Sequence, residues 1–151
     1  NSGGHVIVFR WADVSGRLPG QRMILPRVNA LNNAIAEVAA RRGAKLVDLW
    51  NDDEYRNPAL WSIDRLHMNA AGHRRTAAHV LAALDVKAEA TWLDAPPHLQ
   101  PLPWARARAA DVQWAREHLA PWVKRRLTGR SSGDLITAKR SALAPVRVDQ
   151  S

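Results

Sequence analysis

Two short apolar runs on either side of an amphipathic helix constrain the fold of this chain most strongly. The run from His5 to Phe9 is rich in β-branched residues and predicts a buried strand, and Lys45 to Leu49 predicts a second. Between them, apolar residues recur every three or four positions from Val28 to Arg41, which predicts a helix ending at Gly43. This spacing predicts a βαβ unit with parallel strands and a right-handed crossover.

The rest of the first hundred residues is less regular. The segment from Gly16 to Pro26 contains two Pro and two Gly and predicts a loop. Asn69 is a suitable cap for a helix that runs to about Leu84. Two strands do not make a stable sheet by themselves, so we expect further strands upstream of His5.

Proline and charge divide the chain. Four Pro residues lie between 95 and 103, and residues 101–151 contain 10 Lys and Arg against 4 Asp and Glu. We expect an α/β domain over 1–94, a linker over 95–103, a basic Trp/Arg helix over 104–128 that Pro121 interrupts, and a loose tail over 129–151.

A carboxylate and an imidazole three residues apart stand just before the helix expected to start at Asn69. Asp64 could accept a hydrogen bond from one ring nitrogen of His67, which fixes the tautomer and leaves the other nitrogen to act as a general base. The alternative is a chance match, with Asp64 as a solvated loop carboxylate and His67 as a partly buried residue before a helix.

The ten residues from Asp64 to His73 resemble the closing block of the SGNH/GDSL hydrolase family, whose pattern is Asp-x-x-His-x-x-x-x-Gly-His. The resemblance covers about residues 5–85. It implies a flavodoxin-like parallel three-layer α/β fold, incomplete at the N-terminus, and hydrolysis of small carboxylic esters. It assigns Asp64 as the orienting acid and His67 as the general base, and it implies no cofactor and no metal.

The family's nucleophile is a Ser in a Gly-Asp-Ser sequence, and a later Gly and Asn help that residue bind the oxyanion. This chain contains no Gly-Asp-Ser sequence, so we expect these blocks upstream of His5. Ser15, Ser62 and Ser131 do not have the setting of a nucleophile. Each oxyanion donor contributes about 3–4 kcal/mol, so we expect negligible esterase activity from this chain alone.

Other polar residues offer weaker candidates. Arg10 and Trp11 follow the first strand at its carboxyl end, where they could line a substrate pocket; alternatively, Trp11 packs in the core and Arg10 is solvated. The acidic run at 52–54 favours a solvated loop over a cation site. His73 and His79 are six residues apart, which does not place them on one helix face, so we expect no metal site.

The basic helix supports a different class of function. Trp and Arg alternate through residues 104–130, which could bind nucleic acid or an anionic membrane in a non-catalytic module. An apolar stripe that includes Leu102, Val112 and Leu119 instead favours packing of this helix against the α/β domain. The chain has no Cys, and its first residues lack a signal-peptide pattern, so we expect a cytoplasmic protein unless a signal lies upstream.

Overall fold

The structure is a computed structural model, and it describes residues 4–14, 21–129, 137 and 142. Its strands are β1 (Ile7–Arg10) and β2 (Lys45–Asp48), and its α-helices are α1 (Gln21–Arg42), α2 (Ala70–Ala83), α3 (Trp104–Trp114) and α4 (Ala120–Leu127). The chain forms two compact units, 1–101 and 102–151.

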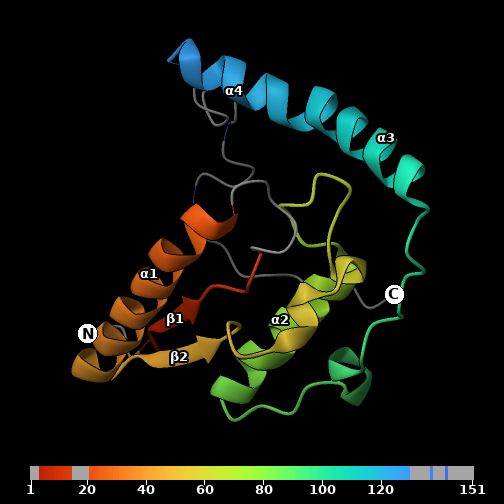
Figure 1. Cartoon of the computed structure of the whole chain (residues 1–151). Coiled ribbons are helices and arrows are strands. Elements are labelled where there is room, and N and C mark those ends of the chain that lie inside the picture. The colour runs from red at the N-terminus through yellow and green to blue at the C-terminus, as the bar shows by residue number, and fades with distance from the viewer. Residues whose placement is uncertain (1–3, 15–20, 130–136, 138–141, 143–151) are drawn as a thin grey trace. The chain divides into compact units, whose positions relative to one another are not determined.

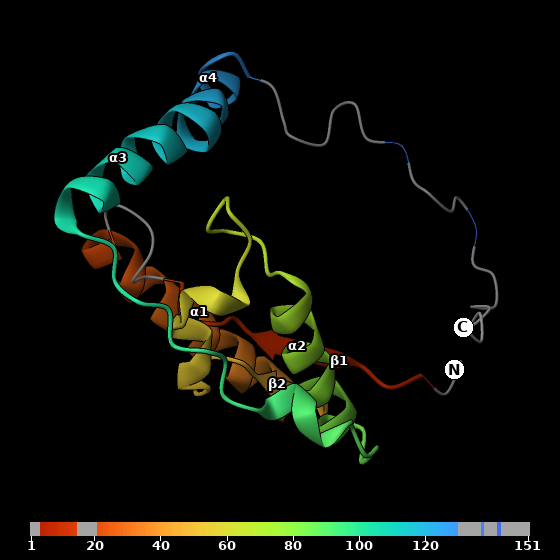
Figure 2. The ribbon, with the colours of Figure 1, turned by 90° about the vertical axis from the view of Figure 1, so that its right-hand side faces the viewer.

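The first unit is an α/β arrangement around a two-stranded parallel sheet. Ile7 of β1 lies opposite Lys45 of β2, and Arg10 lies opposite Asp48. Figures 1 and 2 show α1 and α2 on opposite sides of these strands. The parallel strand–helix–strand unit expected from the sequence is therefore present, with α2 as a third layer.

The core lies between the strands and α2. Val47 and Leu49 come from β2 and the residue after it, and they meet Tyr55, Leu60 and Trp61 from the segment that leads to α2. The Trp61 ring packs edge-on to Tyr55 with centroids 6.4 Å apart, and its Nε1–H donates to the Tyr55 carbonyl oxygen at 2.8 Å. This packing fixes the segment that precedes the Asp64 loop.

Helix α1 begins earlier than the sequence predicts. It starts at Gln21, within the segment expected to be a loop, and continues through Pro26. Proline removes one backbone N–H, but this one lies near the start of a 22-residue helix, where the remaining turns supply the stability. The prediction from proline content therefore placed the start of this helix too late in the sequence.

One edge of β1 is open among the residues that the structure describes. The Val6 carbonyl accepts from Lys45 of β2 and the Arg10 carbonyl accepts from Leu49, the residue after β2, so the carbonyls of Ile7 and Phe9 point to the opposite edge. Beside that edge a groove of about 400 Å³ is lined by Val8, Phe9, Trp11, Ala34, Ile35 and Val38. On α1, Leu31 is 52% exposed and Val38 is 45% exposed, so the two strands leave these apolar side chains uncovered.

Within the described part of the second unit, residues 104–127 form a nearly continuous helix, and the stretch 95–103 before it has no regular structure. Pro121 does not end it, contrary to the expected interruption. The segment 115–119 is π-helical, and the Ala120 N–H donates to the Ala115 carbonyl five residues back. This wider turn is a typical way for a helix to accommodate a local change in its hydrogen bonding.

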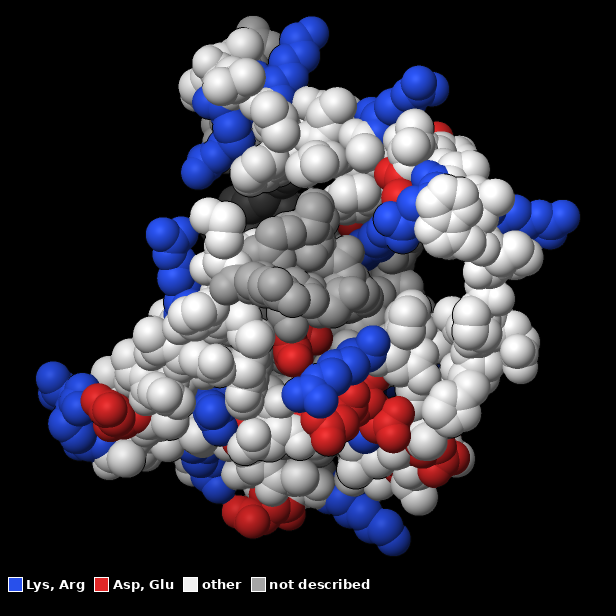
Figure 3. All heavy atoms as spheres, viewed as in Figure 1, with Lys and Arg blue, Asp and Glu red and all other residues white. Residues whose placement is uncertain are grey.

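Basic side chains project along this helix (Figure 3). Residues 104–127 contain six Lys and Arg and two Asp and Glu. The guanidinium of Arg126 lies 5.9 Å from the centre of the Trp122 ring. In the described part of the chain, no helix combines the length and apolar character that crossing a bilayer requires.

Candidate functional site

A short loop before α2 carries the Asp64 and His67 side chains. Trp61 and Met68 form an isolated antiparallel bridge at its base, and the Ser62 N–H donates to the His67 carbonyl at 2.8 Å. Within the loop Arg65 has a φ of 61°, a left-handed conformation that costs a non-glycine residue free energy. The surrounding hydrogen bonds must therefore hold the loop in this form.

The two carboxylate oxygens of Asp64 bind different groups. Oδ1 accepts the backbone N–H groups of Leu66 and His67, each at 3.0 Å, which fixes the tight turn around Arg65. Oδ2 lies 2.5 Å from Nδ1 of the His67 ring. One side chain thus holds both the backbone and the imidazole of the residue three positions later.

The charge of Asp64 determines the tautomer of His67. Burial raises the pKa of the Asp64 carboxyl, but the hydrogen bonds from the His67 ring and from the two backbone N–H groups outweigh it and lower the pKa to about 2. An ionised carboxylate only accepts hydrogen bonds, so at neutral pH Nδ1 carries the proton. In neutral His67 the other nitrogen, Nε2, is then a proton acceptor.

The pair is accessible. The His67 side chain is 75% exposed, and that of Asp64 is 27% exposed. An oriented imidazole with an available basic nitrogen can take a proton from a hydroxyl group. The structure therefore brings together the two residues that the sequence pattern joins.

Arg10 and Trp11 lie at the carboxyl end of β1, as their sequence position requires. The Arg10 guanidinium is mostly buried and pairs with Asp48 across the strands, with Nη1 2.9 Å from Oδ2. Trp11 has a different setting: the residue is 60% exposed, while its backbone N–H and carbonyl are both bound by the side chain of buried Asn32. Arg10 is thus a paired residue, and Trp11 presents an open aromatic surface.

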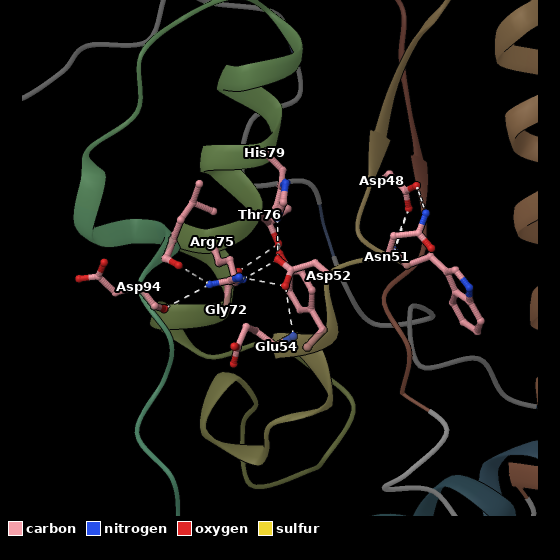
Figure 4. Close-up of polar contacts among 12 residues, drawn as sticks. Asp48, Asn51, Asp52, Glu54, Gly72, Arg75, Thr76, His79 and Asp94 are labelled. Atoms are coloured by element: carbon pink, nitrogen blue, oxygen red, sulfur yellow. Dashed lines mark hydrogen bonds and ion pairs between the residues drawn. The ribbon is translucent and has the colours of Figure 1, made fainter.

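A second Asp–His pair was not foreseen. Asp52, expected in a solvated loop, has a side chain only 9% exposed. Its carboxylate accepts from Arg75 at 2.6 and 2.9 Å, from the Glu54 N–H at 3.1 Å and from His79 Nε2 at 2.7 Å (Figure 4). The expectation failed because Arg75 and His79 stand more than 20 residues later, so no local pattern joins them to Asp52.

Burial and pairing act against each other at this second cluster. Burial raises the pKa of the Asp52 carboxyl, but hydrogen bonds from Arg75 and His79 and the charge of Arg75 lower it further, so the net pKa is below its usual value. Arg75 also donates to the carbonyls of Leu93 and Asp94, which ties the segment after α2 to the same carboxylate. All of these contacts join parts of the scaffold.

Ser62 is the one serine among the described residues, and it does not present a nucleophile. Its hydroxyl donates to the Met68 carbonyl at 3.3 Å. Ser15, Ser131 and the tail beyond residue 129, apart from 137 and 142, lie outside the described residues. Within the described ranges, no group of three or more His, Asp or Glu side chains is arranged to hold a metal ion.

The comparisons with known proteins concern the part of the chain that contains Asp64 and His67. Residues 1–75 match the model of the GDSL-like Lipase/Acylhydrolase family, and this range includes both strands, Asp64 and His67. No curated protein and no solved structure matches the chain.

Proposed function

Residues 1–75 of this chain belong to the GDSL-like lipase/acylhydrolase family, and from this membership we propose that the chain is the C-terminal part of a serine esterase domain. His67 is the general base and Asp64 is the residue that orients it. The observation that carries the proposal is the 2.5 Å contact between His67 Nδ1 and Asp64 Oδ2 on an exposed loop.

The chemistry follows from this arrangement. A serine hydroxyl from outside these 151 residues attacks the carbonyl carbon of a carboxylic ester, and Nε2 of His67 takes the hydroxyl proton. Collapse of the tetrahedral intermediate breaks the ester C–O bond, and the same proton passes to the leaving alcohol. Water then hydrolyses the acyl-enzyme with His67 again as base. Asp64 stays ionised throughout and stabilises the imidazolium.

The open edge of β1 supports the proposal that the sheet is larger in the complete enzyme. The backbone groups of Ile7 and Phe9 face that edge, and the groove beside it is apolar. Additional parallel strands would pair with β1 and cover the exposed face of α1, giving a flavodoxin-like three-layer domain. The exposure of Trp11, just after the carboxyl end of β1, supports its assignment to the substrate pocket.

The test uses an extended enzyme, defined as residues 1–151 with an N-terminal segment that restores a Gly-Asp-Ser strand. We expect it to hydrolyse small carboxylic esters and to react with a fluorophosphonate, which labels activated serines. His67→Ala should abolish both. His73→Ala is the matched control. His73 is also exposed, but the histidine that is hydrogen-bonded to Asp64 is His67. Ester hydrolysis that survives His67→Ala would show that His67 is not the base.

Binding of nucleic acid or anionic lipid through residues 104–130 is the second candidate. It is favoured by the exposure of Trp104, at 78%, and of Leu127, at 83%, on a helix with excess positive charge. Phosphate recognition by such a helix weakens steeply as salt rises. A titration of duplex DNA, or of vesicles containing phosphatidylserine, at low and high salt tests it, and no binding at low salt would exclude it.

A further inference from the structure

We propose that Asn69 is a positioning residue for His67, acting through the base of the loop that His67 and Asp64 occupy. This inference rests on the proposed function, because it concerns how the proposed general base is held. The hydrogen bonds of the Asn69 side chain go to backbone groups and not to the side chain of Asp64 or His67. Instead, its side chain joins the segment that enters the loop to the helix that leaves it.

Each end of the Asn69 carboxamide binds two backbone groups. Nδ2 donates to the carbonyls of Ala59, at 2.7 Å, and Trp61, at 3.3 Å, on the segment that enters the loop. Oδ1 accepts the N–H groups of Ala71, at 3.0 Å, and Gly72, at 3.1 Å, in the first turn of α2. The backbone N–H of Asn69 adds a bond to the Leu60 carbonyl at 3.1 Å.

The two ends of the Asn69 side chain therefore stabilise different parts of the structure. The Oδ1 contacts cap α2, which Ser does as well as Asn. The Nδ2 contacts close the base of the loop, and Ser lacks both the reach and the second donor to replace them. Substitution of Asn69 by Ser therefore removes the loop closure while retaining the helix cap.

A substitution at Gly72 provides an independent way to separate α2 from the segment that enters the loop. A Cβ at this position would overlap the carbonyl oxygen of Leu60, a backbone atom that cannot rotate away. Gly72→Ala should therefore push α2 away from the entering segment. Because Ala favours the helix more than Gly does, any loss seen in this variant does not come from helix propensity.

The experiment measures the loop directly by NMR on the extended enzyme. The readouts are the proton signal of His67 Nδ1–H and the titration of the Asp64 carboxyl carbon, with circular dichroism as a check of helix content. The matched control is Asn57→Ser. Asn57 also caps a helical turn, through Ala59, and donates from Nδ2 to the carbonyls of Pro96 and Pro97, but it lies outside the loop.

We expect Asn69→Ser to keep the helix content, to lose the downfield Nδ1–H signal, and to raise the pKa of Asp64 from about 2 toward the ordinary value of about 3.9. Gly72→Ala should do the same, and Asn57→Ser should change neither readout. If Asn69→Ser fails to fold, Gly72→Ala gives the result alone. An unchanged Nδ1–H signal and Asp64 titration in a folded Asn69→Ser or Gly72→Ala variant would overturn the proposal.

The extended enzyme provides a second readout. We expect Asn69→Ser to lower kcat by about 10²-fold with little change in KM, because a misplaced base slows chemistry more than binding. If the extended enzyme has no esterase activity but the NMR changes occur, the positioning role stands and the proposed function is wrong. If the enzyme is active and the NMR readouts do not change, the positioning role is wrong.

Discussion

The two Asp–His pairs of this chain have similar contact distances and different surroundings. Asp64 and His67 meet at 2.5 Å on a loop, and the His67 side chain is 75% exposed. Asp52, in the loop after β2, and His79, on α2, meet at 2.7 Å, and Arg75 binds the same carboxylate. An Asp–His contact alone therefore does not identify a general base.

The partners of each carboxylate explain the difference. The partners of Asp64 include two backbone N–H groups at Oδ1 and the His67 ring at Oδ2, so one oxygen of the carboxylate meets the imidazole. Asp52 instead receives a two-point contact from Arg75, and His79 is a third partner. The exposed pair is suited to exchange a proton, whereas the buried cluster holds the loop after β2 against α2.

The largest expected effect separates the two histidines by activity. In the extended enzyme, His67→Ala should lower kcat by about 10⁶-fold, the loss typical of a base in a serine triad, with little change in stability. His79→Ala should leave kcat within a few-fold of the unaltered enzyme while it lowers the melting temperature. Steady-state kinetics and thermal unfolding of both variants measure this, and equal losses of kcat would remove the distinction.

The next effect concerns stability. Arg75→Ala should destabilise the chain by about 3–5 kcal/mol, because it leaves the Asp52 charge buried without its main partner. Arg56→Ala is the matched control: Arg56 also contacts two carboxylates, those of Asp13 and Asp53, but its side chain is 59% exposed. Its loss should cost less than about 1 kcal/mol.

Urea unfolding of both arginine variants measures these free energies. Similar costs for Arg75→Ala and Arg56→Ala would mean that burial does not distinguish the Asp52 cluster.

The smallest effect is the response to acid. The pKa values of the Asp52 and Asp64 carboxyls lie below the ordinary value of about 3.9, so the folded chain binds fewer protons than the unfolded chain. The stability that they supply is complete above about pH 4. It is lost as pH falls through the folded pKa, which is about 2 for Asp64.

Urea unfolding at a series of pH values between 6 and about 2 tests the sign of this response. Asp64→Asn should reduce the acid-dependent loss of stability, since it removes one titrating group. Stability that rises as pH falls through this range would contradict the pKa directions of both carboxyls.

Local sequence patterns predicted the exposed Asp64–His67 pair. They did not predict the buried Asp52–His79 pair, because its contacts join residues that are far apart in the sequence. Asp64 and His67 are three residues apart and precede a helix whose cap, Asn69, is a local signal, so spacing alone placed them together. Asp52 was misread because its partner Arg75 belongs to a helix that folds back onto it. The start of α1 was also misplaced, because one proline near the start of a 22-residue helix does not prevent the helix from beginning before it.

The two parallel strands followed from their apolar composition, which is a local property as well. The exposure of Trp11 and the mostly buried Arg10 did not follow from it. Both depend on long-range partners: Asn32 binds the backbone of Trp11, and Asp48 pairs with Arg10. Sequence spacing carries no information on such contacts until the fold brings the elements together.

The most direct test of the central claim is a double-mutant cycle on Asp64 and His67 in the extended enzyme, read as kcat/KM for an ester. If Asp64 acts only by orienting His67, Asp64→Asn alone should cost about 10⁴-fold and should add nothing further to His67→Ala. If the two losses multiply instead, the residues act independently, and the assignment of a catalytic Asp64–His67 pair is contradicted.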